Sequence, residues 1–158
     1  MFTDEEIAYL RSQPLARLAT VGEDGQPDVV PLSFDYDGAH FWVGGVGSQV
    51  LHTRKFRNIT AGRRKVSLVI DDLVSFDPFI ARAIRVYGIA DDPVERLGLI
   101  GPGTYSRITP TAAWAWNMAG EPAGETWYEP RRITMRAGPS TPPNHPTERR
   151  TAGRAADD

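Results

Sequence analysis

The residues best suited to chemistry are three cations within four positions, Arg54, Lys55 and Arg57, in the segment 53–59. A guanidinium can bond a phosphate through two parallel donors, and an ammonium adds a point charge. The cluster follows a glycine-rich stretch and therefore predicts a phosphate-binding site. On charge alone, the alternative is a solvated surface face, because charge runs are common on protein surfaces.

The placement of these side chains around a helix favours the binding site. With about 3.6 residues per turn, Phe56, Ile59 and Leu51 share one arc that includes Lys55. We therefore expect Lys55 to point toward the edge of the core. Arg57 faces away from this arc and could cross a subunit seam, whereas Asn58 could satisfy backbone groups near the helix end.

Elements that would position this cluster can be predicted along the chain. Thr3 and Glu6 form a capping box for a short helix that stops before Pro14. Ser48 is a candidate N-cap for the basic helix, which we expect to reach about Ala61. Residues 91–104 predict a loop with one helical turn, and Pro110 predicts an edge or a bulge in the last strand. The predicted strands cover residues 15–21, 29–36, 39–43, 65–70, 82–90 and 106–118.

These elements predict a mainly β fold, a six-stranded antiparallel barrel with flanking helices. The barrel domain should span residues 1–136, and residues 137–158 read as a disordered tail rich in Pro, Arg and Asp. A six-stranded barrel encloses no large lumen, so a ligand would lie outside it or at a subunit seam. That expectation favours a dimer.

Other chemical signals have simpler explanations. The pairs Asp71-Asp72 and Asp91-Asp92 follow predicted strands, where turns need acidic residues, so we assign no acid–base pair. No histidine has a second ligand at metal spacing. Trp114 and Trp116 share one face of a strand, which favours a place in the core or in a dimer interface. Gly44, Gly45 and Gly47 could let a ligand approach the backbone.

Composition narrows the class of protein. The formal charge of −2 over 158 residues argues against broad nucleic-acid binding, and the chain has no cysteine for a disulfide or thiolate site. No stretch approaches the roughly 18 apolar residues of a membrane span. We expect a cytoplasmic protein without a metal site.

Four segments, in this order and spacing, resemble the flavin-binding split-barrel superfamily. The most similar members are pyridoxamine-phosphate-oxidase-like proteins that use the deazaflavin coenzyme F420. Further similarity extends over Arg107–Pro110 and Trp114–Asn117, so that the resemblance covers about residues 5–118. The four segments are Arg17–Pro27, Val30–Phe34, Thr53–Ile59 and Val66–Asp71.

The resemblance implies a homodimer of six-stranded split barrels with two cofactors at the subunit interface. Thr53, Arg54 and Lys55 match the Ser-Arg-Lys triplet that holds the flavin phosphate in pyridoxamine-phosphate oxidases, with backbone donors from Gly45 to Gln49 nearby. The implied ring contacts are the residues Val30, Pro31, Leu32 and Ser33.

The implied activity is hydride transfer between coenzyme F420 and a small organic substrate. One alternative is an FMN-dependent oxidase or reductase on the same fold, and another is a non-catalytic protein that carries a flavin or deazaflavin. A small barrel that binds nucleic acid through the basic helix is a further alternative, which the acidic total disfavours.

Overall fold

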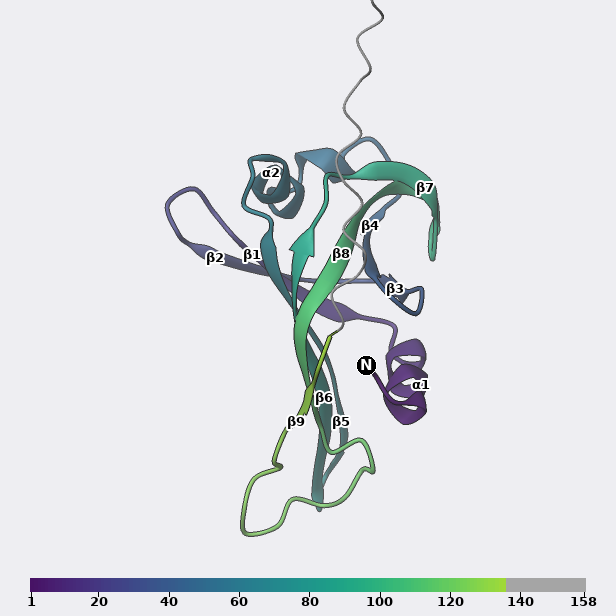
Figure 1. Ribbon diagram of the computed structural model, residues 1–158, viewed down its shortest axis with the longest axis vertical. Helices are drawn as coiled ribbons and strands as arrows, with labels where there is room; N and C mark the ends of the chain where they lie inside the picture. Colours follow the sequence, from purple (N-terminus) through teal and green to yellow (C-terminus); the bar gives the residue numbers. More distant parts are fainter. Residues whose placement is uncertain (136–158) are drawn as a thin grey trace, which may run out of the picture.

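Strands dominate residues 1–135, the part of the chain that this computed structural model describes (Figure 1). The predicted tail at 137–158 lies outside the described residues. In chain order the elements are α1 (Asp4–Ser12), β1 (Ala16–Val21), β2 (Pro27–Leu32), β3 (Phe34–Tyr36), β4 (Phe41–Gly45), η1 (Val50–His52), α2 (Arg54–Thr60), β5 (Lys65–Phe76), β6 (Phe79–Ala90), β7 (Val94–Gly98), β8 (Gly101–Trp116) and β9 (Arg131–Ile133).

The sheet closes into a barrel because one strand bends. Its strand order is β2-β1-β5-β6-β8-β4-β3, with antiparallel pairs throughout. Only Ser33 separates the end of β2 from the start of β3, so the chain passes directly from one end of this order to the other. With β2 and β3 counted as one bent strand, the barrel has six strands, β1, β2/β3, β4, β5, β6 and β8. This confirms the predicted six-stranded split barrel.

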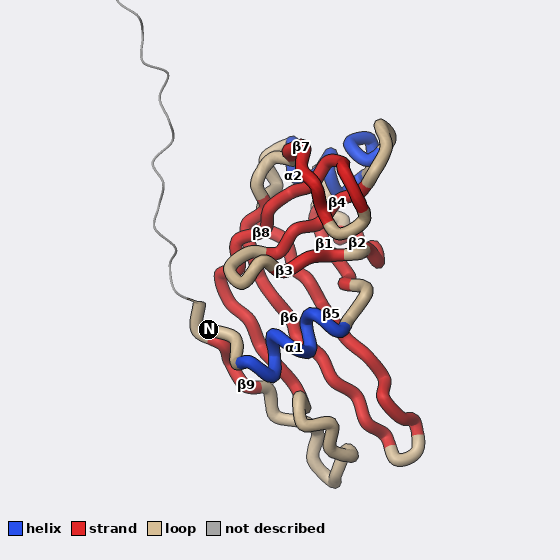
Figure 2. Tube along the Cα trace, turned by 90° about the vertical axis from the view of Figure 1, so that its right-hand side faces the viewer, coloured by secondary structure: helices blue, strands red, loops and turns tan. Residues whose placement is uncertain are grey.

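The core lies inside the barrel and under α1. Alternation places Leu18, Leu68 and Ile84 on the inner face, where all three side chains are fully buried. Helix α1 lies across the long strands β5 and β6 (Figure 2) and contributes Tyr9 and Leu10 to the same core. Its predicted capping box is confirmed, because Thr3 and Glu6 each bond the other's backbone N–H.

An ion pair between the buried Glu6 and the exposed Arg131 joins the two ends of the described chain. Glu6 is 2% exposed, and its Oε1 accepts hydrogen bonds from Nε and Nη2 of Arg131, at 2.9 and 2.7 Å. Arg131 belongs to β9, a short strand that pairs with β8 and that the sequence did not predict. A three-residue strand is too short to show a periodic pattern in the sequence. It is recognised as a strand only by its pairing with β8.

The prediction of a loop with one helical turn at 91–104 is wrong. Residues Val94–Gly98 form β7, which pairs with the first residues of β8 in a hairpin. Leu99 and Ile100 form the turn, and Gly101, the first residue of β8, follows it with a φ of +121° that suits glycine. The glycines and Pro102 that argued against a helix therefore belong to a hairpin, and β8 begins earlier than predicted.

Pro110 marks a bulge, as predicted. Along β6 and β8, Tyr87 pairs with Ala112 and Gly88 pairs with Pro110, so Thr111 is the extra residue. Proline has no N–H to donate to a ladder, and a bulge removes that demand. The side-chain hydroxyl of Thr111 instead donates to the carbonyl of Tyr87, at 3.2 Å.

Candidate functional site

The basic helix is shorter than predicted. Val50–His52 form a 3-10 turn, Thr53 is extended (φ −68°, ψ 150°), and α2 runs from Arg54 to Thr60. Ser48 is therefore not the N-cap. The Thr53 hydroxyl donates to the carbonyl of Val50 at 2.7 Å instead of capping α2. Because the chain breaks at Thr53, Leu51 is not on the helical arc and is exposed.

Lys55 lies at the edge of the core, as expected. Phe56 and Ile59 are fully buried, and the Nζ of Lys55 lies 5.4 Å from the centroid of the Phe56 ring. Burial lowers the pKa of Lys55, and the negative charge of Asp28 acts in the opposite direction. No ion pair or hydrogen bond within residues 1–135 engages the ammonium. Lys55 is thus a half-buried cation whose charge is not matched by a contacting carboxylate.

Asn58 contacts Thr20, and Lys55 is influenced by Asp28, the cross-strand partner of Thr20. Its Nδ2 donates to the Thr20 hydroxyl at 2.9 Å, and the Asn58 side chain is buried. Thr20 pairs with Asp28 in the β1–β2 register, and Asp28 is the carboxylate that acts on Lys55. The predicted capping role of Asn58 is therefore replaced by a contact between helix and sheet. Arg54 and Arg57 are exposed on the remaining surface of α2.

The other predicted contacts, Val30 to Ser33, occupy the bent edge of the barrel. Leu32 is buried and Val30 half-buried on the inner face, whereas Pro31 faces the other side opposite Arg17. Among the described strands, β2 pairs only with β1. Main-chain N–H and C=O groups on its outer edge are therefore free of ladder pairing. Val30, Pro31 and Leu32 pair with the first residues of β1, at the open end of the β1–β2 hairpin, whereas α2 contacts Thr20 near the turn of that hairpin.

The glycines before α2 are explained by strand packing. A Cβ at Gly44 would collide with the Thr104 carbonyl, and one at Gly103 would collide with the Gly45 carbonyl. A Cβ at Gly45 itself would lie 3.3 Å from Cγ2 of Val50. Close contact between β4 and β8 already demands small residues here. It therefore explains Gly44 and Gly45 without a ligand that approaches the backbone.

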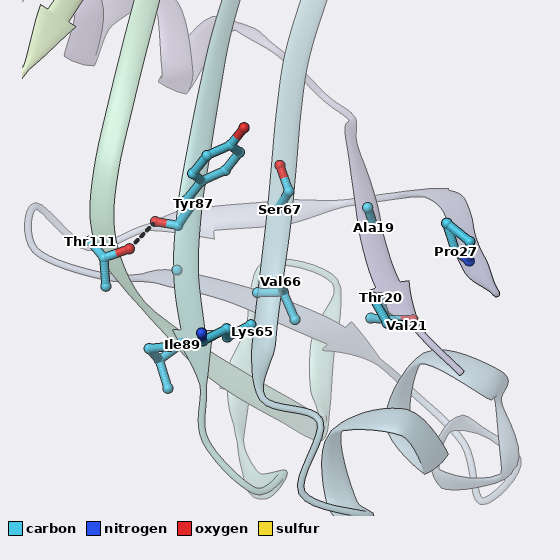
Figure 3. A pocket seen from close by; sticks show the side chains of 11 residues that line it. Ala19, Thr20, Val21, Pro27, Lys65, Val66, Ser67, Tyr87, Ile89 and Thr111 are labelled. Carbon is cyan, nitrogen blue, oxygen red and sulfur yellow. Dashed lines mark hydrogen bonds between the residues drawn. The ribbon is translucent and has the colours of Figure 1, made fainter. Parts of the chain in front are cut away.

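A groove that the sequence did not predict crosses the outer face of β1, β5, β6 and β8. It encloses about 490 Å³ and is mostly apolar. Figure 3 shows Lys65 on β5 extending toward Ile89 on β6, with Ser67 and Tyr87 further along the same two strands. The sequence signal for this groove is the presence of apolar residues at strand positions that face outward. Val21, Tyr87 and Ile89 are examples, with exposed fractions of 41%, 43% and 36%. The groove is lined by Ala19, Thr20, Val21, Pro27, Lys65, Val66, Ser67, Tyr87, Gly88, Ile89 and Thr111.

The two tryptophans of β8 also lie on this outer face. Trp114 and Trp116 are half-buried, whereas Ala113 and Ala115 between and beside them are buried. A place in the barrel core is therefore excluded. The Trp114 ring packs edge-on against Tyr87, with 5.1 Å between ring centroids.

The acidic pairs each lie against arginines. Asp91 and Asp92 follow β6 as expected, and they contact Arg107 and Arg64. The expected turn at Asp71-Asp72 is wrong, because both residues are inside the long strand β5. Each of these four carboxylates therefore lies against an arginine, which gives it a structural role in the sheet.

Within that strand, Asp72 binds Arg82 at 2.7 Å and accepts a hydrogen bond from the Tyr9 hydroxyl at 2.9 Å. Burial would raise the pKa of Asp72, but the hydrogen bonds from Arg82 and Tyr9 outweigh it and lower the pKa. Oδ1 of its neighbour Asp71 lies 3.3 Å from Nε of Arg17, without hydrogen-bond geometry.

Residues 1–135 contain no cluster of three or more side chains that could together hold a metal ion. No helix in that range is long and apolar enough to cross a membrane.

Comparisons with known proteins agree with this architecture. The model of the pyridoxamine 5'-phosphate oxidase family matches residues 2–130. A 5a,11a-dehydrotetracycline/5a,11a-dehydrooxytetracycline reductase of Streptomyces rimosus is 43% identical over 89 residues, which cover 56% of this chain. The match spans 62% of the length of that relative.

Solved structures share the fold at low identity. An F420 reductase superposes with a TM-score of 0.53 and 23% identity, over 67% of this chain and 93% of that one. A haem storage protein of Vibrio cholerae superposes with a TM-score of 0.52 and 17% identity, over 70% of this chain and 91% of that one. At such identities the likeness establishes the fold alone.

The described residues form an antiparallel split barrel with a short basic helix packed against β1. With the family model matching most of its length, the chain belongs to the pyridoxamine 5'-phosphate oxidase family.

Proposed function

We propose that the protein is a coenzyme F420-dependent oxidoreductase that transfers a hydride between the deazaflavin and a small organic substrate. The observation that carries the proposal is Lys55, a half-buried ammonium at the start of α2 with no contacting carboxylate among residues 1–135. Burying a cation without a partner is costly, and a bound phosphate would remove that cost. Arg54, adjacent and exposed, adds a guanidinium that can bond phosphate through two donors.

The bent edge strand supports the same assignment. Val30 to Ser33 run along the free edge of β2, and their unpaired main-chain groups can bond the polar edge of a flat ring. When bound, the deazaflavin supplies the hydride chemistry, so the protein needs to bind and orient rings rather than provide a nucleophile. A triad of catalytic side chains is not required.

One relative supports a reductase, and one structural neighbour supports F420. The relative is the reductase of Streptomyces rimosus, 43% identical over the matched segment, and the neighbour is named an F420 reductase. The first relative also offers a precedent for a substrate with fused rings. Because the match spans 62% of its length, we leave the substrate as a small organic molecule.

We further propose a homodimer in the cytoplasm with a cofactor at each subunit seam. The exposed apolar positions on the outer sheet face, including Val21, Val29 and Ile89, support such a contact. The absence of cysteine suits a reducing compartment. In this arrangement we assign minor cofactor contacts to Thr53, Arg57 and Gly45, and Asn58 orients α2 through its hydrogen bond to Thr20.

Two alternatives use the same site. FMN also carries a phosphate and a flat ring, and would fit the same residues. A non-catalytic carrier is the other alternative, favoured by the structural likeness to a haem storage protein.

Titration of the purified protein with F420 and with FMN, followed by cofactor fluorescence, separates these functions. We expect saturable binding of F420 with at least tenfold preference over FMN, and transfer of reducing equivalents from reduced F420 to an enone or quinone acceptor. Stronger binding of FMN would favour the flavin enzyme. Tight binding of either cofactor without turnover on any acceptor would favour the carrier, and no binding of either would refute the proposal.

A further inference from the structure

Arg85 differs from the arginines that bind carboxylates in this sheet. Its Nε is buried and has no hydrogen-bond acceptor within the described chain. Arg17, on the same outer face, lies against Asp71, and Arg82, three residues earlier on β6, lies against Asp72. No ion pair with a described carboxylate engages Arg85. The charge at Arg85 is thus left unmatched on the outer face of the sheet.

Aromatic rings surround this guanidinium. Its Cζ lies 4.4 Å from the Trp114 ring centroid, 5.1 Å from that of Tyr87 and 5.4 Å from that of Trp116. Arg85 and Trp114 are cross-strand partners in the β6–β8 register, and this pairing fixes the stack. Cation–π contacts hold the guanidinium in place without supplying a hydrogen-bond acceptor, so its terminal N–H groups, which unlike Nε are not buried, stay available for a ligand.

The cluster adjoins the apolar groove. Tyr87 belongs to both, because it lines the groove and contacts Trp114 edge-on. Lys65 lies on the same face within the groove and adds a second positive charge. A ligand that lies over Tyr87 would therefore meet flat apolar walls on one side and a fixed cation at its end.

We propose that Arg85, Trp114 and Trp116 form a subsite for a flat, conjugated ring whose oxygen atoms carry negative charge. The rings select flatness, because stacking needs two planar faces. The guanidinium selects the anion, because its fork matches two oxygens of a carboxylate or of a delocalised diketone. Whether this ring belongs to the acceptor substrate or to the deazaflavin rests on the proposed function. The requirement for a flat, anionic ring does not rest on it.

Calorimetric titration with three probes tests the subsite without any cofactor. The probes are 2-naphthoate, the neutral 2-naphthamide of equal shape, and cyclohexanecarboxylate, which is anionic but not flat. We expect 2-naphthoate to bind about tenfold or more tightly than either of the others, as expected for one charge-assisted contact. Equal binding of the acid and the amide would overturn the proposal.

Substitution assigns the effect to Arg85. Arg85→Met keeps the length of the side chain and should lose the preference for the acid, and Arg85→Lys should keep part of it. Arg85→Gln provides a second neutral variant if Arg85→Met folds poorly. Arg17→Met, an arginine on the same face that already contacts Asp71, is the matched control and should leave 2-naphthoate binding unchanged. If Arg85→Met changes only the oligomeric state, the cluster is a subunit contact and the proposal is wrong.

A final titration with F420 identifies the ring. A loss of F420 affinity in Arg85→Met would place the deazaflavin over the cluster, whereas unchanged F420 affinity with lost 2-naphthoate binding would place the acceptor there. If the wild type does not bind F420, the proposed function fails, but the result with 2-naphthoate still decides the subsite.

Discussion

Replacing Lys55 with methionine tests the phosphate site most directly. Methionine retains an unbranched apolar chain against Phe56 and removes only the charge. Because no described carboxylate contacts Lys55, the substitution breaks no existing ion pair and should not destabilise the fold. Removal of a half-buried charge can even relieve a desolvation cost.

The expected loss falls on the cofactor. A hydrogen bond to a charged group contributes about 1.5–3 kcal/mol, which corresponds to an increase of about 10- to 150-fold in Kd. Since Lys55 is half-buried rather than fully enclosed, we expect the lower part of this range. Arg54→Met should cost less, because Arg54 is exposed and its contact is screened by solvent.

Protonation supplies a second readout. Burial lowers the pKa of Lys55, and a bound phosphate would raise it again, so cofactor binding should weaken as pH rises through the pKa of the free protein. This dependence should be absent in Lys55→Met. The assay is fluorescence titration with F420 and FMN over a range of pH, with circular dichroism as a check on folding.

Arg11→Met provides the control, since Arg11 is an exposed cation in the last turn of α1. Its dissociation constants should equal those of the wild type. Identical dissociation constants for Lys55→Met and the wild type, with both cofactors, would refute the assignment of the phosphate site.

Two further predictions concern stability. Arg131→Met should lower the free energy of unfolding by about 2 kcal/mol in urea, because it leaves the buried Glu6 carboxylate without its partner; an unchanged midpoint would contradict this. Asp72 has a lowered pKa in the folded protein, so its ion pair with Arg82 stabilises above about pH 4 and is lost as pH falls through the folded pKa. Asp72→Asn should therefore show a weaker loss of stability on acidification than the wild type, and equal acid sensitivity would argue against the pair.

Much of the fold could be predicted because its signals are local. The capping box at Thr3 and Glu6 is a contact between residues three apart, and the structure confirms it. Alternation along 29–36 predicted one extended run, which the structure shows as the bent strand β2/β3 that closes the barrel. Pro110, which lacks an N–H, predicted an edge position or a bulge, and the structure shows a bulge.

The predictions from sequence are wrong where contacts with distant parts of the chain determine the local structure. Residues Val94–Gly98 have little intrinsic preference, and their pairing with the start of β8 makes them a strand. The basic helix was predicted to begin too early, because the helical spacing of apolar residues continues across Thr53. In the structure the backbone at Thr53 is in the β conformation, and α2 begins after it. Apolar residues on both faces of β6 gave no sign of which face was covered, so the outer groove was missed.

For the candidate site, the sequence alone determined the composition of the basic cluster and the face on which Lys55 lies. Both follow from chemistry and helical spacing within a few residues. Tertiary structure decided which groups meet: Asn58 with Thr20, Glu6 with Arg131, and Arg85 with two tryptophans of another strand. These contacts join residues far apart in the chain, and only strand register and barrel closure fix which side chains become neighbours.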